Sequence, residues 1–120
     1  MNPMNNGLKV GTTLTVLPDG GRPSNLAMTG KSVRLEPIDP ARHGDDLYAA
    51  AYGPKGDPTN DMWTYMSFGP FADADAFATW LATQGANEER EVYALVDTDA
   101  DRAQGMASYL RIEPQWASCE

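Results

Sequence analysis

The sequence predicts an α/β domain of the α+β type, in which an antiparallel-rich mixed sheet is covered by two helices. The prediction rests on apolar residues that alternate with polar ones as in strands, on segments that repeat apolar residues with the helical period, and on the turn residues between them. The expected order is strand, helix, helix, strand, strand and the start of a further strand. The two later strands should pair as an antiparallel meander.

The first convincing strand covers residues 33–38. Its alternation predicts that Val33 and Leu35 face the core, while the residues between them face solvent. Asp39 then begins a helix, because its side chain can accept hydrogen bonds from the free amides of the first turn. Gly53 is the expected end of this helix.

The second helix is expected from Asp73 to about residue 84, with Gly85 as its stop. A strand at 92–96 is apolar on both faces, which favours a place inside the sheet. A loop at 97–104 and a strand at 106–112 should follow as a hairpin.

The two ends of the chain are expected to differ. Residues 1–30 form an N-terminal arm, in which Leu14 and Val16 permit a short strand. Residues 116–120 begin an extended segment that has no room to finish. Because an unfinished strand leaves backbone groups unpaired, we expect the domain of residues 31–120 to be truncated.

Composition excludes several classes of function. The chain has 120 residues, a formal net charge of −8, 42% hydrophobic residues and 22% charged residues, as expected for one folded domain. An acidic surface repels phosphate backbones, so nucleic acid is not an expected partner. No apolar run is long enough for a membrane span, and the single cysteine, Cys119, favours the cytoplasm.

The densest signal is the segment 62–71, MWTYMSFGPF, where aromatic residues and methionines gather in a loop. Aromatic side chains in loops line pockets, but they also fill gaps between helices and a sheet. Core packing is favoured for Trp63 and Phe71. The substrate-binding candidates in this segment are Trp63, Tyr65, Met66 and Phe68.

A resemblance is carried by GKSVRLEPIDPARHGDDLYAA, by MWTYMSFGPF and by VYALVDTDADRAQGMASYLRIEPQWASCE. Together these segments resemble the GNAT superfamily of N-acetyltransferases, and within it the RimJ/RimL-type ribosomal-protein branch. The resemblance runs from about residue 30 to residue 120. It implies a partial GNAT fold, namely the amino-terminal, acceptor-side half of the domain.

The resemblance implies transfer of an acetyl group from acetyl-CoA to a primary amine, either a protein N-terminus or a small molecule. The family's Gly-rich turn and following helix, which hold acetyl-CoA, have no counterpart in the sequence, so the cofactor-binding residues are unknown. Glu120 matches the position of a family glutamate and is the candidate base, with a solvated terminal residue as the alternative. Tyr109 and Arg111 are further substrate-binding candidates, although surface packing is the alternative for both.

Other polar residues favour structural roles. His43 is expected to cap or pack against the first helix, and the aspartates of the 97–104 loop suit a turn better than a calcium site. We expect no metal site.

A second hypothesis from a different class is a non-catalytic interaction module. In that case the open sheet edge near residues 116–120 pairs with another chain, for example in a homodimer.

Overall fold

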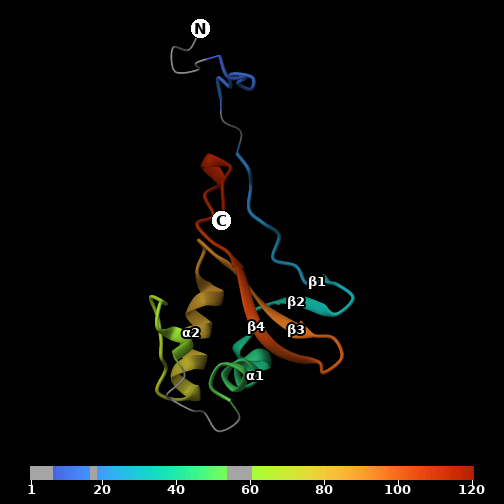
Figure 1. Cartoon of the computed structure of the whole chain (residues 1–120), viewed down its shortest axis with the longest axis vertical. Coiled ribbons are helices and arrows are strands. Elements are labelled where there is room, and N and C mark those ends of the chain that lie inside the picture. The colour runs from blue at the N-terminus through green and yellow to red at the C-terminus, as the bar shows by residue number, and fades with distance from the viewer. Residues whose placement is uncertain (1–6, 17–18, 54–60) are drawn as a thin grey trace.

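The computed structural model describes residues 7–16, 19–53 and 61–120 of the chain. Figure 1 shows their arrangement: a sheet, two helices packed against it, and an extended N-terminal segment. The predicted fold class is confirmed, since the strands of the described part form a single sheet. No helix in these residues is both long enough and apolar enough to cross a bilayer.

The sheet has the strand order β1 (Met28–Thr29), β2 (Val33–Pro37), β3 (Glu91–Asp97) and β4 (Arg102–Tyr109). Every neighbouring pair is antiparallel, and β3 and β4 form the predicted meander. β3 lies inside the sheet with four of its residues buried, as its continuous apolar run predicts. β4 lies at the edge.

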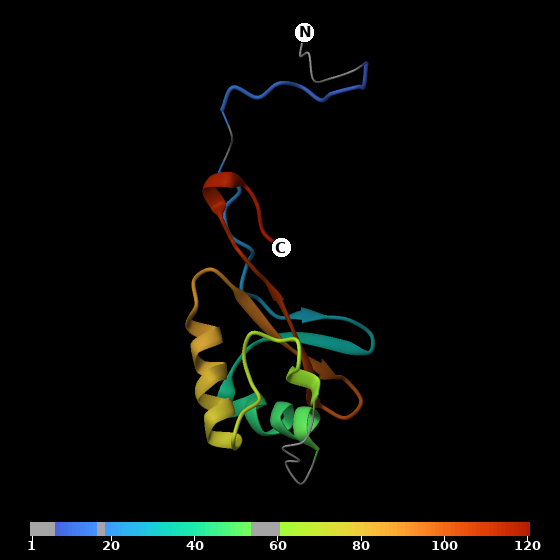
Figure 2. The same ribbon diagram turned by 60° about the vertical axis from the view of Figure 1, so that its left-hand side comes forward.

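Two helices, α1 (Pro40–Tyr52) and α2 (Ala74–Ala86), cover one face of the sheet (Figure 2). Both predicted caps are confirmed. The Asp39 carboxylate accepts a hydrogen bond from the amide two residues on, and Asp73 accepts one from the amide three residues on. Gly53 ends α1 with a positive φ of 77°, which glycine adopts without steric cost.

The core lies between the helices and the sheet. It joins apolar side chains from α1, α2, β3 and β4 with one tryptophan of the loop that precedes α2. Burial of these side chains is the main force that holds the helices on the sheet. Its largest members are Leu47, Tyr52, Trp63, Phe77, Leu81 and Val96.

The side chains of β2 point the opposite way from the prediction. Val33 is 38% exposed and Leu35 is only partly buried, whereas the Glu36 carboxylate lies 3.6 Å from His43 Nε2 on α1. The register pairs Glu36 with the fully buried Ala94, which places both on the helix-covered face. The alternation is present, but alternation alone does not say which set of residues faces the helices.

Several predicted boundaries are also wrong. Leu14 and Val16 form no strand and are exposed. The helix α2 continues past Gly85 and is capped at Asn87 instead. The loop expected at 97–104 is shorter, because the Asp97 carboxylate binds two amides of the turn and β4 begins directly after it.

The segment around residues 62–66 contains a 3-10 helix at Asp61–Trp63. Asn60 directly precedes this turn and has a side chain that suits a cap, but it lies outside the described residues. The strand expected at 106–112 ends at Tyr109, and Arg111 has a positive φ of 48°, which is incompatible with an extended strand.

Residues 110–120 form what we call the C-terminal hairpin. Leu110 and Glu120 exchange two backbone hydrogen bonds of 2.8 Å each, and a 3-10 helix at Pro114–Trp116 makes the turn. Extended pairing at the end of the chain is therefore present, although Trp116 lies in the turn and not in a strand. The N-terminal arm runs beside this hairpin, where the Gly20 amide donates to the Pro114 carbonyl at 2.9 Å (Figures 1 and 2).

Candidate functional site

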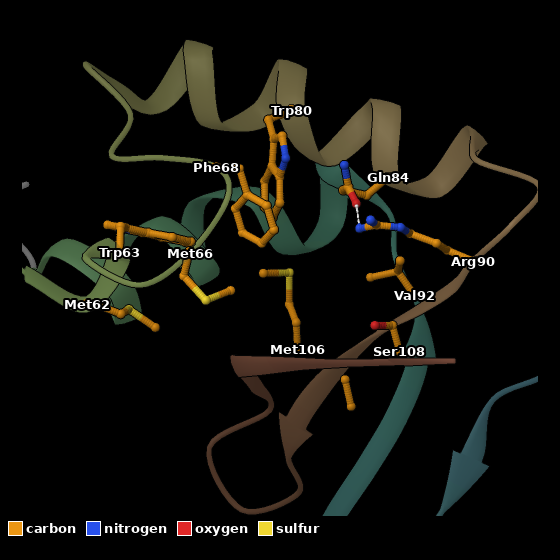
Figure 3. Close-up of a pocket in the computed structure, with 11 residues that line it drawn as sticks. Met62, Trp63, Met66, Phe68, Trp80, Gln84, Arg90, Val92, Met106 and Ser108 are labelled. Atoms are coloured by element: carbon orange, nitrogen blue, oxygen red, sulfur yellow. Dashed lines mark hydrogen bonds between the residues drawn. The ribbon is translucent and has the colours of Figure 1, made fainter. Parts of the chain in front are cut away.

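A pocket of about 250 Å³ lies between the sheet, α2 and the loop that precedes α2. We call it the α2 pocket. Figure 3 shows Trp80 and Met106 in its middle, with Met62, Met66 and Phe68 toward one end. Its lining is mostly apolar, which is typical of small-molecule sites.

The loop wall of the α2 pocket is fixed by Trp63. Its indole is 5% exposed and lies 5.5 Å from the ring of Phe71 and 6.1 Å from that of Tyr52, between ring centroids. The Phe71 amide donates to the Tyr52 hydroxyl at 2.7 Å, which ties the loop to α1. A Cβ at Gly69 would come within 2.9 Å of the same indole, so glycine is required there. The loop is thus held at both ends.

The opposite end of the α2 pocket is polar. Gln84 of α2, Arg90 just before β3 and Ser108 of β4 gather there (Figure 3). The Arg90 guanidinium donates a hydrogen bond of 2.8 Å to the Gln84 side-chain oxygen. The pocket therefore has an apolar end and a cationic end.

The predicted substrate-binding residues fall into two groups. Trp63, Met66 and Phe68 line the α2 pocket together. Tyr65 does not, and its side chain is 98% exposed. Trp63 has both of the roles weighed for it, because it belongs to the buried core and also lines the pocket.

The other three candidates lie elsewhere. Tyr109 packs edge-on against Tyr93, 6.3 Å away between ring centroids, and β-sheet register places Tyr93 on the face that the helices leave open. Arg111 and Glu120 pair with each other across the C-terminal hairpin at 3.0 Å, and both are exposed. None of the three lines the α2 pocket.

His43 has the structural role that the sequence predicts. Its Nδ1 accepts a hydrogen bond of 3.0 Å from the amide of Asp39, the cap residue of α1. Its side chain is 2% exposed. Cys119 is exposed, and the described residues contain no group of three potential metal ligands.

The sequence did not predict the part of the α2 pocket that is formed by α2, by Arg90 and by β4. Trp80 and Gln84 are four residues apart on α2, a spacing that indicates only that one face of the helix packs against the core. Met106 and Ser108 are two residues apart on β4, so both lie on the same face of the strand. These spacings are visible in the sequence, but Arg90 precedes β3 and gives no periodic signal.

Two carboxyl groups, those of Glu36 and Asp101, have lowered pKa values because each pairs with an arginine. The Arg42 guanidinium binds both oxygens of Glu36, at 2.8 and 3.1 Å, and lowers the pKa of that carboxyl group. Hydrogen bonding to Arg34 lowers the pKa of Asp101. Neither carboxyl group lines the α2 pocket.

Two solved structures share this architecture. One is a probable acetyltransferase of the GNAT family from Chromobacterium violaceum, with 31% identity and a TM-score of 0.71 over 88% of this chain and 51% of that one. The other is a GCN5-related N-acetyltransferase from Brucella melitensis, with 26% identity and a TM-score of 0.68 over 78% of this chain and 41% of that one. The chain has a partial GNAT fold. It spans about half the length of these GNAT structures or less.

No protein-family model matches the chain, and no curated protein matches it. The assignment to the GNAT fold therefore rests on the solved structures. The finer resemblance to the RimJ/RimL-type branch stays a prediction.

The described residues do not fit the pyrophosphate of acetyl-CoA. GNAT proteins are expected to hold that group on free amides at a helix start, as helix N-termini hold anions in general. In this partial GNAT fold, the carboxylates of Asp39 and Asp73 each occupy a helix start and accept from one of its amides, and Asp75 adds a negative charge in the first turn of α2. Both helix starts would therefore repel a pyrophosphate.

Proposed function

We propose that the chain forms the acceptor-binding part of an N-acetyltransferase that acetylates a primary amine, with acetyl-CoA as the acetyl donor. The observation that carries the proposal is a small, mostly apolar pocket within a partial GNAT fold. We propose the α2 pocket as the acceptor site, with Trp63, Met66 and Phe68 in contact with the apolar part of the amine.

An amine attacks an acyl group only in its neutral form, so a proton acceptor is needed near the reacting nitrogen. Neither a carboxylate nor a histidine lines the α2 pocket in the described part of the chain. Glu120 remains our proposed proton acceptor. It does not line the α2 pocket, and its side chain is 59% exposed and bonded to Arg111, so water molecules would have to carry the proton from the amine to it.

Amine binding can be measured through the tryptophans, because Trp63 and Trp80 line the α2 pocket while Trp116 is exposed. The chain with Trp116→Phe is titrated with hexylamine and 2-phenylethylamine, and its fluorescence is recorded. We expect a saturable change for the amines, weakened by Met66→Ala. The absence of any saturable change in a folded chain would contradict the acceptor site.

Acetyl transfer is tested separately. The chain is incubated with the amine and millimolar acetyl-CoA, and acetylated amine is sought by mass spectrometry against a reaction without protein. Product above this control supports the enzymatic part of the proposal. Amine binding without product would reduce the chain to an amine-binding domain.

We also expect weak binding of acetyl-CoA to this chain, because both α-helices of its described part begin at a capping aspartate. Isothermal titration calorimetry measures this directly. A dissociation constant of about 1 μM, equivalent to about −8 kcal/mol, would contradict this expectation.

A second candidate function is the non-catalytic interaction module. Ser118 and Glu120, in the segment where the open edge was expected, pair with Glu113 and Leu110 of the same chain, so we place the edge on β4 instead. β4 lies at the edge of the sheet, and only β3 pairs with it along residues 102–109 of the described chain. An edge strand is a template for another chain. Analytical ultracentrifugation at high concentration tests the homodimer form of this hypothesis, because a monomer would rule out self-association through that edge.

A further inference from the structure

Arg90 differs from every other arginine of this acidic chain. The sequence contains six arginines, all within the described part, and five have a carboxylate oxygen within 3.6 Å. Arg90 has no carboxylate partner among the described residues, and its only side-chain hydrogen bond goes to the neutral Gln84. A partly buried cation without an anion is costly, so an anion from outside the chain would stabilise it.

The glutamates that flank Arg90 in the sequence do not fill this role. The Glu91 carboxylate lies 3.4 Å from Arg22, and Glu89 forms no ion pair with Arg90 among the described residues. The side chain of Arg90 instead reaches the α2 pocket, where Gln84 orients it (Figure 3). Of its five N–H donors, the Gln84 bond uses one, which leaves donors for a ligand.

The α2 pocket therefore presents an apolar wall at one end and a guanidinium at the other. A guanidinium pairs with a carboxylate through two parallel hydrogen bonds, which fixes both the position and the orientation of the bound group. A pocket of about 250 Å³ suits a small molecule and not a folded partner.

We infer that the acceptor is an α-amino acid with a large apolar side chain, whose carboxylate binds Arg90 and whose side chain lies against Met66, Phe68 and Trp80. This inference rests on the proposed function, because it takes the α2 pocket as the acceptor site. It also excludes polyamines, because a second ammonium group would meet the positive charge of Arg90.

The test compares ligands that differ by one group. L-phenylalanine and 2-phenylethylamine share a ring and an amine, but only the first has a carboxylate. We expect L-phenylalanine to bind at least about tenfold more tightly to the Trp116→Phe chain, because hydrogen bonds to charged groups are stronger than neutral ones. Spermidine should not bind.

Two variants assign the difference to one residue. Arg90→Gln removes the charge in the pocket and should abolish the preference for L-phenylalanine, while 2-phenylethylamine still binds. Arg102→Gln is the matched control, because it makes the same charge change outside the α2 pocket and should keep the preference. Near-ultraviolet circular dichroism confirms that each variant is folded, and Arg90→Lys should restore part of the preference.

The outcomes separate the two proposals. If 2-phenylethylamine binds as tightly as L-phenylalanine, or if Arg90→Gln leaves the preference intact, the amino-acid inference is wrong and the amine site stands. If neither ligand binds, the acceptor site itself is wrong.

Discussion

The α2 pocket and the C-terminal hairpin both contain residues that the sequence singles out for function, yet the two regions are built differently. Trp63 at the pocket is 5% exposed and packed among aromatic rings, whereas Trp116 in the hairpin is 62% exposed. The guanidinium of Arg90 has no carboxylate partner in the described chain, whereas Arg111 pairs with Glu120.

The difference shows which region is ready to bind a ligand. An apolar wall that packs on the buried Trp63 and a cation without a carboxylate partner in the described chain both favour a ligand, because the ligand would cover the wall and supply the missing charge. The hairpin pair is already satisfied and largely in water, where such pairs contribute little. The α2 pocket is therefore the better supported of the two as a binding region.

We expect the largest effect on stability from a substitution in the wall of the α2 pocket. Trp63→Ala should lower the free energy of unfolding by about 3–5 kcal/mol, because it removes a buried aromatic side chain. Trp116→Ala, the same substitution in the hairpin, should change it by less than about 0.5 kcal/mol. Urea denaturation measures both, and Trp63→Phe extends the series if the alanine variant does not fold. Equal effects at the two positions would contradict the contrast.

Substitutions at the helix starts test the same difference between the α2 pocket and the C-terminal hairpin, with a smaller expected effect on stability. Asp73 caps α2, which carries the pocket residues Trp80 and Gln84, whereas Glu113 precedes the 3-10 helix of the hairpin without a side-chain cap bond. Asp73→Ala should cost about 1 kcal/mol in thermal or urea unfolding. Glu113→Ala removes no cap hydrogen bond and should leave the free energy of unfolding nearly unchanged. A loss of stability as large as that of Asp73→Ala would contradict this expectation.

A pH titration tests the charge pair beneath α1. Because Arg42 lowers the folded-state pKa of Glu36, the pair stabilises the fold above the unfolded pKa near 4.5, and this contribution is lost as the pH falls through the folded pKa. We expect Glu36→Gln to reduce stability at neutral pH and to flatten the acid limb of the stability curve. The effect is small, because the Arg42 side chain is 53% exposed. An unchanged acid limb would argue against the pair.

The smallest expected effect is in the hairpin. Arg111→Ala breaks the pair with Glu120, but the two side chains are 77% and 59% exposed, so water replaces the lost contact. We expect a urea midpoint that cannot be distinguished from that of the unchanged chain. A clear loss of stability would show that the hairpin is more tightly held than its exposure indicates.

The sequence by itself determined the elements that depend on neighbours along the chain. The caps Asp39 and Asp73, the end of α1 at Gly53 and the interior strand around Val92 all follow from local hydrogen bonding and apolar runs. The resemblance to GNAT proteins led to the same architecture that the solved structures share.

Only the tertiary structure decided which faces meet. Alternation in β2 is equally compatible with either face toward the helices, and packing placed Glu36 beneath α1 while Val33 stayed exposed. The α2 pocket likewise needs Phe68, Gln84 and Ser108 from segments far apart in the sequence. Their approach depends on long-range burial, which no local pattern encodes.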